Sequence, residues 1–343
     1  MLRCLLISII IMTSLTTGRA QDPVFSQFYA SGLHLNPALC GLGSDVVVGL
    51  NYRTQWGAID LPYRTFQFTA IHPIVRQGIN AKNMGGFGVN LFSDEAGDNR
   101  QFVAQGLSLA SSYNFHLNRS GKHIIATALQ FGVIQRQVNF NGLQWSTQYS
   151  QVLGYDPTLP GEYFGTERIT TPVINAGIMW RLVDDTHFAP LKMYYHGFAV
   201  SNLNRPQAFT HDANDAQALL LKLHGGYLHT LNNGLELSPN YLIQHQRETQ
   251  INIGGYAAYP LPDVTSRYID DLKVSFGMWY RIRDSFIFTT GASTSTWTVG
   301  LSYDLNTSSL SRYFPGASAF EVSFSYRIKT LQQKLPRFST PLI

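Results

Sequence analysis

Charged residues are scarce in this chain of 343 residues, because Asp, Glu, Lys and Arg together make up 13%, against about 25% in an average soluble domain. The charges form no long block of one sign, and the formal net charge is only +4. This composition argues against a disordered polyelectrolyte. It also argues against a nucleic-acid partner, since no stripe of Lys and Arg stands out.

Long hydrophobic runs are also missing, except for one at the start of the chain. Arg3 precedes an apolar run at 5–12, and small residues then lead to Ala20. This order predicts a cleaved secretory signal over residues 1–20. The alternative, a membrane anchor, needs about 20 apolar residues, and this run is too short.

Cysteine is nearly absent as well. Of the two cysteines, Cys4 lies in the predicted signal and Cys40 remains alone. A single cysteine excludes an intrachain disulfide framework and a Cys-based zinc site in the mature chain. We expect Cys40 to be a small buried residue.

Motifs of common enzymes do not occur. The sequence has no His-Glu-x-x-His, no Gly-x-Ser-x-Gly and no phosphate-binding Gly-x-x-x-x-Gly-Lys, and its ten histidines are scattered. His224 and His229 would point to opposite faces of one strand. The acidic residues from Asp94 to Asp98 lack the calcium-loop spacing and predict a solvated turn. We therefore expect no enzyme activity, no cofactor and no metal site.

What the sequence has in abundance is aromatic residues and glycine, arranged with a period of two. In one such segment Phe320, Val322, Phe324, Tyr326 and Ile328 alternate with Glu321, Ser323, Ser325 and Arg327. Strict alternation of this kind predicts β-strands with one apolar and one polar face. The Gly85-Gly86-Phe87-Gly88 run lies in such a pattern, so its glycines predict close packing and not a nucleotide site.

Several alternating segments reach ten residues or more, which is longer than a usual soluble strand. Tyr and Phe often stand near the segment ends, where a membrane barrel has its aromatic girdles. Together with the signal, this favours an all-β fold, an antiparallel barrel that spans the outer membrane. A secreted β-sandwich is the alternative, and the strand lengths disfavour it.

We predict about fourteen strands over residues 45–329. Their centres lie near Val48, Gln67, Val89, Leu109, Phe131, Ile178, Ala199, Tyr227, Tyr241, Gly255, Gly277, Phe288, Val299 and Phe324. An even count places both termini of the chain in the periplasm. Residues 141–170, 204–218 and 306–317 then become external loops, and residues 330–343 a periplasmic tail.

Residues 21–44 precede the first predicted strand and are rich in aromatic residues. A disordered tail would seldom carry Phe25, Phe28 and Tyr29, so we expect this segment to fold into the mouth of the barrel as a plug or hatch. Asn36-Pro37 would turn the chain into the first strand. A partner-binding role and a simple packed cap remain equally open. The candidate plug or partner-binding residues are Asp22, Pro23, Phe25, Ser26, Gln27, Tyr29, Asn36, Pro37, Ala38 and Gly41.

These residues also carry a resemblance. Asp22-Pro23-x-Phe25-Ser26-Gln27-x-Tyr29 followed by Asn36-Pro37-Ala38-x-x-Gly41 resembles the signature of the PorP/SprF family of type IX secretion system outer-membrane proteins of Bacteroidota. Further matches follow in order along the mature chain, including Tyr52-Arg53-x-Gln55-Trp56, Ser201-Asn202-Leu203-Asn204-Arg205-Pro206 and Trp279-Tyr280-Arg281-x-x-Asp284. Each motif alone is weak, but their order and spacing are specific.

The resemblance implies a non-enzymatic outer-membrane barrel that works in protein export. Its partners would be ring or translocon proteins of the secretion system, or a large secreted adhesin, including those used in gliding motility, and membrane lipids would surround it. A passive transporter of the FadL or porin kind, for small or hydrophobic ligands, is the alternative function, because such barrels also carry an N-terminal hatch.

Overall fold

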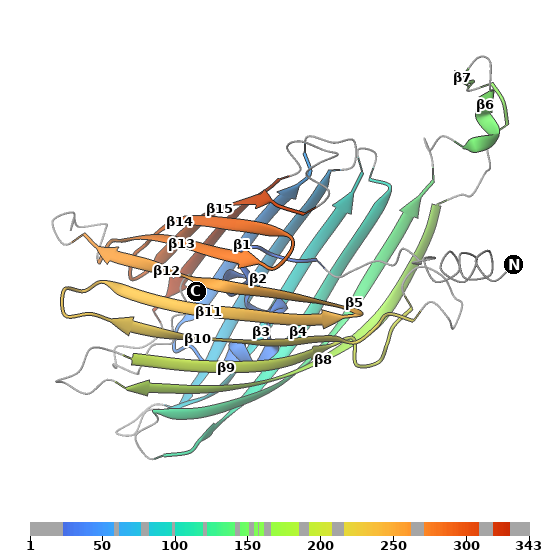
Figure 1. The fold of residues 1–343 in the computed structure, drawn as a ribbon. Coiled ribbons are helices and arrows are strands. Elements are labelled where there is room, and N and C mark those ends of the chain that lie inside the picture. Colours follow the sequence, from blue (N-terminus) through green and yellow to red (C-terminus); the bar gives the residue numbers. More distant parts are fainter. Residues whose placement is uncertain are drawn as a thin grey trace, which may run out of the picture.

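Fourteen antiparallel strands form one closed barrel in the computed structural model (Figure 1). The structure describes residues 23–57, 62–76, 82–97, 100–118, 122–140, 145–150, 154–156, 158–160, 166–184, 192–207, 216–261, 271–308 and 318–329. The predicted fold class and strand count are confirmed. The predicted signal (1–20), the residue Asp22 and the predicted tail (330–343) lie outside the described residues.

The barrel strands follow one another in chain order, and β16 closes the barrel against β1. Each predicted strand centre falls inside one of them. Their bounds are β1 Val46–Gln55, β2 Tyr63–Arg76, β3 Lys82–Ala96, β4 Phe102–His116, β5 His123–Asn139, β8 Thr166–Asp184, β9 Lys192–Ser201, β10 Leu220–Thr230, β11 Glu236–Gln246, β12 Glu248–Pro260, β13 Lys273–Arg281, β14 Ser285–Ser293, β15 Trp297–Asn306 and β16 Ala319–Ile328.

The two ends of the barrel are assigned from this topology. Both chain ends of an even-stranded outer-membrane barrel face the periplasm, so β1 starts and β16 ends at the periplasmic end. The other end is external. Among the barrel strands, β2, β3, β4, β5 and β8 have 14–19 residues, whereas β1 and β9 to β16 have 9–13. Each is at least as long as the 9–11 residues that cross a bilayer when tilted.

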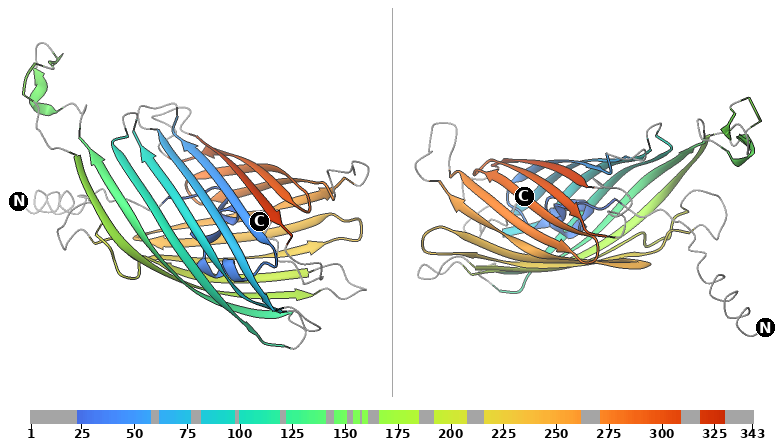
Figure 2. Two further views of the ribbon diagram at one scale, coloured as in Figure 1. Left: turned by 180° about the vertical axis from the view of Figure 1, so that it is seen from behind. Right: turned by 45° about the horizontal axis from the view of Figure 1, so that its top comes forward.

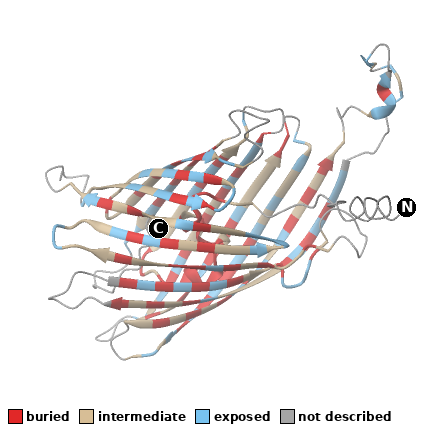
Figure 3. Ribbon diagram, in the orientation of Figure 1, coloured by how far each residue is buried: buried red, intermediate tan, exposed pale blue. Residues whose placement is uncertain are grey.

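Side chains alternate between the outer and inner faces of the wall, as Figure 3 shows by the alternating bands of burial. On β15, Leu301 is 38% exposed and Ser302 only 2%. The same alternation runs along β16, where Glu321 and Ser323 are buried between exposed Phe320 and Phe324. Apolar side chains outside and polar ones inside are what a lipid-facing barrel requires.

The longest external connection joins β5 to β8. It spans 140–165, so the predicted loop of 141–170 was too long by five residues: 166–170 belong to β8, whose pairing with β5 continues to Thr166. The connection carries the 3-10 helix η4 (Ser146–Gln148) and a small hairpin of β6 (Tyr149–Ser150) and β7 (Gly154–Tyr155). Figure 1 shows this hairpin well away from the barrel.

The remaining helical elements precede β1. They are three short 3-10 helices, η1 (Phe28–Ala30), η2 (Gly32–His34) and η3 (Pro37–Gly41). None of the helices in the described residues is long and apolar enough to cross a membrane.

Candidate functional site

The N-terminal segment, residues 23–45, lies inside the barrel. Figure 2 shows it in blue within the ring of strands, and η3 contacts β2, β3, β4, β5 and β8. Its candidate residues Phe25, Ser26, Gln27, Tyr29 and Asn36 are all buried. The lumen is therefore occupied by residues of the N-terminal segment.

One side of the segment packs on an apolar part of the inner wall. Phe28, Tyr29, Leu35, Leu39 and Leu42 form one buried cluster with inward-facing side chains of β5 and β8 to β14. The wall contributes Ile124, Met179, Val183, Met193, Tyr195, Leu228, Leu242, Tyr256, Trp279 and Ile287. The inner face is thus not polar throughout, because this part of it serves as the core of the plugged barrel.

Tyr29 marks the centre of that contact. Its ring centroid lies 5.1 Å from the Trp279 ring, and Trp279 Nε1 donates a hydrogen bond to Asn240 Oδ1 at 2.6 Å. Both aromatic side chains are at most 2% exposed. Burial, with a smaller contribution from the Glu321 carboxylate, raises the pKa of Tyr29 above its usual value, so this phenol stays neutral.

The other side of the segment meets a polar wall. Gln67 Nε2 donates to the carbonyl oxygen of Ser31 at 2.7 Å and to Asn90 Oδ1 at 2.7 Å. Asn51 Nδ2 donates to the carbonyl oxygen of Ala30 at 3.0 Å. Asn51 thus satisfies the carbonyl at the end of η1, and Gln67 adds a second bond to the Ser31 carbonyl, which also accepts the backbone N–H of His34 at 3.0 Å.

Ser26 lies in a cluster of buried charges near the external end of the barrel. Its backbone N–H donates to Glu321 Oε2 at 2.7 Å, and its hydroxyl donates to Asp304 Oδ2 at 2.6 Å. Two guanidinium groups, from Arg53 and Arg281, donate to Ser26 Oγ. A single serine of the segment therefore touches four charged residues of the wall.

The four charged side chains also form ion pairs with one another. Arg53 lies 3.1 Å from Asp304 and 3.4 Å from Glu321, and Arg281 lies 3.3 Å from Asp304. All four side chains are at most 4% exposed. Buried charges are tolerated only when they are paired and hydrogen-bonded, and Ser26 supplies part of that pairing. We call Arg53, Arg281, Asp304 and Glu321 the charge cluster.

Gln27 extends the same attachment along β15 and β16. Its backbone N–H donates to Glu321 Oε1 at 3.2 Å, and its side-chain Nε2 donates to the carbonyl oxygen of Glu321 at 3.2 Å. Ser323 Oγ donates to Gln27 Oε1 at 2.8 Å. The Phe25-Ser26-Gln27 motif thus binds the external half of the wall, deeper than the periplasmic mouth in which a hatch would be expected.

Asn36 caps η3 and fixes the segment to the opposite wall. Its Oδ1 accepts the backbone N–H of Ala38 at 2.9 Å, with Pro37 at the first helical position. Its Nδ2 lies 3.1 Å from His224 Nε2 and donates to the carbonyl oxygen of Ile178 at 3.2 Å. Asn36 therefore starts a helix, whereas the sequence predicted a turn directly into the first strand, which begins ten residues later at Val46.

Glycines let η3 approach the wall. A Cβ on Gly86 would collide with the carbonyl oxygen of Cys40, and one on Gly88 with the side chain of Leu33. On the segment itself, a Cβ on Gly41 would collide with Ser112. The predicted role of the Gly85-Gly88 run in close packing fits these contacts, and Cys40 is buried and free of disulfides.

His34 ends η2 beside a small cavity of about 40 Å³ that Pro23, Gln130 and Lys222 also line. His34 Nε2 shares a hydrogen bond with the carbonyl oxygen of Pro23 at 3.0 Å, and Lys222 Nζ donates to the carbonyl oxygen of His34 at 2.6 Å. Burial, with a smaller contribution from the Lys222 cation, lowers the pKa of His34 to about 3, against the effect of the Pro23 hydrogen bond.

The structure places nine of the ten candidate residues inside the barrel, within the N-terminal segment. The tenth, Asp22, lies outside the described residues. Sequence reasoning missed the wall residues that hold them, above all the charge cluster. One signal was available: Arg53, Asp304 and Glu321 stand at inward positions of alternating strands. Among the described residues, no group of three His, Cys, Asp or Glu side chains could hold a metal ion.

The sequence was also compared with known protein families and curated proteins. The profile of a family described as type IX secretion system membrane protein PorP/SprF matches residues 17–326. No curated protein matches the sequence.

Several solved barrels resemble the fold. The Pseudomonas putida toluene transporter TodX has a TM-score of 0.48 and 10% identity over 91% of this chain and 96% of its own. A Pseudomonas aeruginosa FadL homologue has a TM-score of 0.42 and 12% identity over 90% of this chain and 99% of its own. At these values the likenesses carry no argument about function. The family match, in contrast, spans most of the sequence and both halves of the site, and the chain belongs to the PorP/SprF family of type IX secretion system membrane proteins, as an outer-membrane β-barrel.

Proposed function

We propose that this barrel binds a protein partner during type IX secretion and that its N-terminal segment is a displaceable plug of the lumen. One observation carries the proposal. The segment with the family motif fills the lumen and is attached at its start to the charge cluster through Ser26 and Gln27. A mere terminal cap would need apolar burial alone, whereas this attachment is polar, specific and far from the start of β1, where the segment joins the barrel.

The burial of the motif residues supports the proposal that the segment is displaced. Phe25, Tyr29 and Asn36 are at most 3% exposed, so a partner reaches these motif residues only if the segment leaves its place. The segment is held by packing and by hydrogen bonds, several of them to charged side chains, and Cys40 forms no disulfide. Such contacts can be exchanged for contacts with a partner, because each hydrogen bond contributes only about 0.5–1.5 kcal/mol net.

The partner is a protein of the secretion machinery, either a ring or translocon component or a large secreted adhesin, including one used in gliding. Deleting the gene and analysing all secreted proteins separates these roles. Loss of every exported cargo assigns the barrel to the core machinery. Loss of one adhesin, with the other cargo still exported, assigns it to that adhesin. Unchanged secretion of all cargo contradicts both roles.

A passive transporter of small or hydrophobic ligands is the competing function. Ligand pockets usually measure about 300–1,000 Å³, whereas the cavity beside Pro23 measures about 40 Å³. The packed apolar cluster around Tyr29 also occupies the inner wall that a hydrophobic ligand would use. Measuring ligand uptake in the same deletion strain decides: uptake lost with secretion intact would favour the transporter.

The role of the plug is tested with two matched double variants. Phe25→Ala with Tyr29→Ala removes two buried rings of the segment, and Phe276→Ala with Tyr259→Ala removes two exposed rings of the outer face. We expect both barrels to fold and to migrate as heat-modifiable species, because the backbone ladder stays complete. Only the first should reduce export. Normal export by the first variant removes the segment from the functional site, and loss of folded barrel reduces it to a structural cap.

A further inference from the structure

The outer face of the barrel carries a histidine at the middle of the bilayer. His196 is exposed and lies fifth among the ten residues of β9. A membrane-crossing strand needs about 9–11 residues, so all of β9 lies in the membrane and His196 near its centre. Ionisable groups at this depth are costly and rare, and they usually mark function.

The other outward-facing histidines of the described strands stand nearer to one end of the barrel. His123 begins β5, and His229 and His245 are the second-last residues of β10 and β11. His72 lies just past the last β1–β2 pair, which joins Val47 to Ile71. Near the membrane interface these rings reach water and lipid headgroups. The His196 ring, near the middle of the bilayer, reaches neither.

His196 belongs to a row that crosses four strands. The register pairs Trp180 of β8 with His196, His196 with Gly225 of β10, and Gly225 with Tyr241 of β11. The Trp180 and His196 rings are stacked, with centroids 5.9 Å apart and an interplanar angle of 6°. His196 Nδ1 lies 3.0 Å from the Tyr241 hydroxyl, so the hydrogen bond passes over β10 at Gly225.

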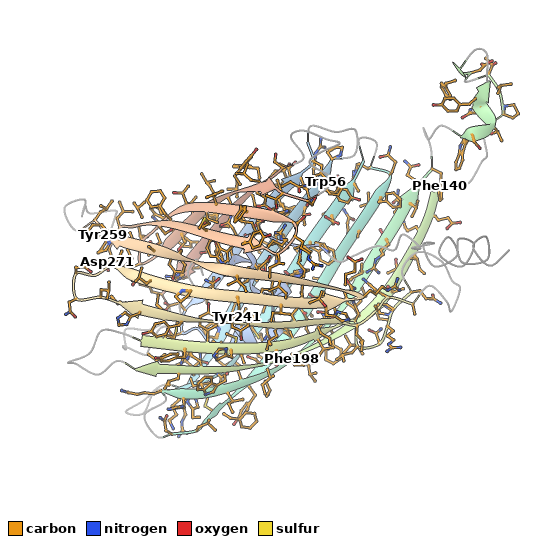
Figure 4. All side chains as sticks on the ribbon, in the orientation of Figure 1. Trp56, Phe140, Phe198, Tyr241, Tyr259 and Asp271 are labelled. Carbon is orange, nitrogen blue, oxygen red and sulfur yellow. The ribbon has the colours of Figure 1, made fainter. Side chains whose placement is uncertain are left out.

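Gly225 makes this bond possible. A Cβ at this position would collide with His196 Nδ1 and would lie against the Tyr241 hydroxyl. The hydrogen bond between His196 and Tyr241 therefore requires a glycine at position 225, because any larger side chain would fill the space that the bond crosses. Figure 4 labels Phe198 on β9 and Tyr241 on β11, the two strands on either side of β10. Phe198 and Leu223 flank the row and are each 42% exposed.

The His196–Tyr241 pair leaves hydrogen-bonding capacity unused. A neutral imidazole has one donor and one acceptor, and a phenol has a donor and an acceptor. One bond between them uses one of each, so a donor and an acceptor remain whichever tautomer is present. Neither side chain has another hydrogen-bond partner in the part of the chain that the structure describes. Acyl chains supply none at this depth, and an unsatisfied polar group in hydrocarbon is unfavourable.

We propose that the outer face of β8–β11, centred on His196 and Tyr241, is a docking surface for a second copy of this chain. Two pairs related by a twofold axis complement each other, because each offers the donor and the acceptor that the other lacks. Gly225 and the nearby Gly255 lower the surface between the larger side chains and allow close approach, as small residues do in other membrane interfaces. A lipid cannot replace the second copy at mid-membrane, since its polar groups lie at the interface.

The test is cross-linking in the native outer membrane, with Cys40→Ser to remove the native thiol. Phe198→Cys places a thiol beside the pair, and Phe324→Cys places one on the outer face of β16. With a short bifunctional thiol reagent, we expect covalent homodimers of Phe198→Cys and at most a tenth as much from Phe324→Cys. His196→Phe should lower the Phe198→Cys dimer at least tenfold, whereas His196→Gln, which keeps a donor and an acceptor, should retain most of it.

His245→Phe serves as the matched control, because it removes an outward histidine from the external end of β11 and should leave the dimer unchanged. Heat-modifiable migration shows that each variant is folded. Three results overturn the proposal: equal dimer from Phe198→Cys and Phe324→Cys, undiminished dimer in His196→Phe, or a Phe198→Cys adduct with a different membrane protein in place of a second copy.

Discussion

Ser26 and Asp304 are 278 positions apart in the sequence, and their side chains share a hydrogen bond of 2.6 Å inside the lumen. The bond joins the start of the N-terminal segment to the inner face of β15, two residues before that strand ends at the external side. The plug is therefore attached at both ends: covalently to β1 at the periplasmic end, and through the charge cluster near the external end. Release of the plug requires the charge cluster to exchange partners.

The first prediction concerns Glu321, which accepts hydrogen bonds from the backbone of both Ser26 and Gln27 and pairs with Arg53. Glu321→Leu leaves Arg53 short of a partner in a buried place. Breaking such a pair usually costs about 3–5 kcal/mol, so we expect a loss of this size in urea unfolding from lipid vesicles. The segment should also become accessible to protease.

The control for this prediction is Glu95→Leu, which removes a pair with Arg100, a residue whose side chain is 57% exposed. An exposed pair contributes at most about 1 kcal/mol. Equal losses for the two variants would mean that the charge cluster does not hold the segment.

The second prediction concerns pH. The pKa of His34 is lowered to about 3 in the docked segment, whereas an exposed histidine has a pKa of about 6.5. The released segment therefore takes up a proton first. Docking has its full free energy above about pH 6.5 and weakens as the pH falls toward 3, by about 2 kcal/mol at pH 5. Hydrogen exchange of the segment at pH 7 and pH 5 measures this, with exchange corrected for its intrinsic pH dependence. His34→Gln should abolish the difference, and an unchanged difference in that variant would exclude His34 as its source.

The third prediction uses two glycines of the barrel wall, on strands β3 and β1. Gly86→Ala places a methyl group against the carbonyl oxygen of Cys40, whereas at Gly49 a Cβ would lie no closer than 4.0 Å to any atom. We expect Gly86→Ala to push η3 from the wall and to raise protease cleavage within 23–45. Gly49→Ala should behave like the unaltered chain. Indistinguishable cleavage in the two variants would show that η3 does not depend on this close approach.

The fourth prediction tests the outer face. Leu301 is the fifth residue of β15 and faces outward, so Leu301→Arg should cost about 2–4 kcal/mol at the bilayer midplane. Ser302 faces the lumen and only approaches Gln27 Nε2 at 3.5 Å, so Ser302→Ala should be nearly neutral. Folding titrations in vesicles give both values, and equal effects would contradict the assignment of the two faces.

The barrel could be predicted from the sequence because its signal is local. Alternation in segments such as 320–328 depends only on neighbouring residues and on which face meets lipid, and every predicted strand centre lies in a strand. The end of the long loop was misplaced because the mostly polar residues 166–171 belong to β8 through pairing with β5. Such pairing partners are distant in the sequence, and local composition does not reveal them.

The site was predicted in part for the same reason. Phe25, Tyr29 and Asn36 could be selected because an aromatic, proline-bearing segment before the first strand is unusual. How deep these residues lie in the lumen could not be predicted. That depth depends on four wall residues that converge from four strands: Arg53, Arg281, Asp304 and Glu321. The depth of His196 likewise follows only from the strand register, although its period-two position was visible.

The central claim, that the plug must leave the lumen for export, can be tested by locking it in place. Cys40 in η3 lies with its Cβ 3.4 Å from the position of a Cβ on Gly88 of β3, close to the usual separation of about 3.5–4.5 Å in a disulfide. Gly88→Cys should therefore form a disulfide with Cys40 in the oxidising periplasm, with the flexible end of Leu33 moving aside. Cys40→Ser in the same chain is the unlocked control. We expect the locked barrel to fold and to reach the outer membrane but to export no partner protein, and a reductant to restore export to the level of the control. Normal export by a fully disulfide-bonded Gly88→Cys chain would contradict the account.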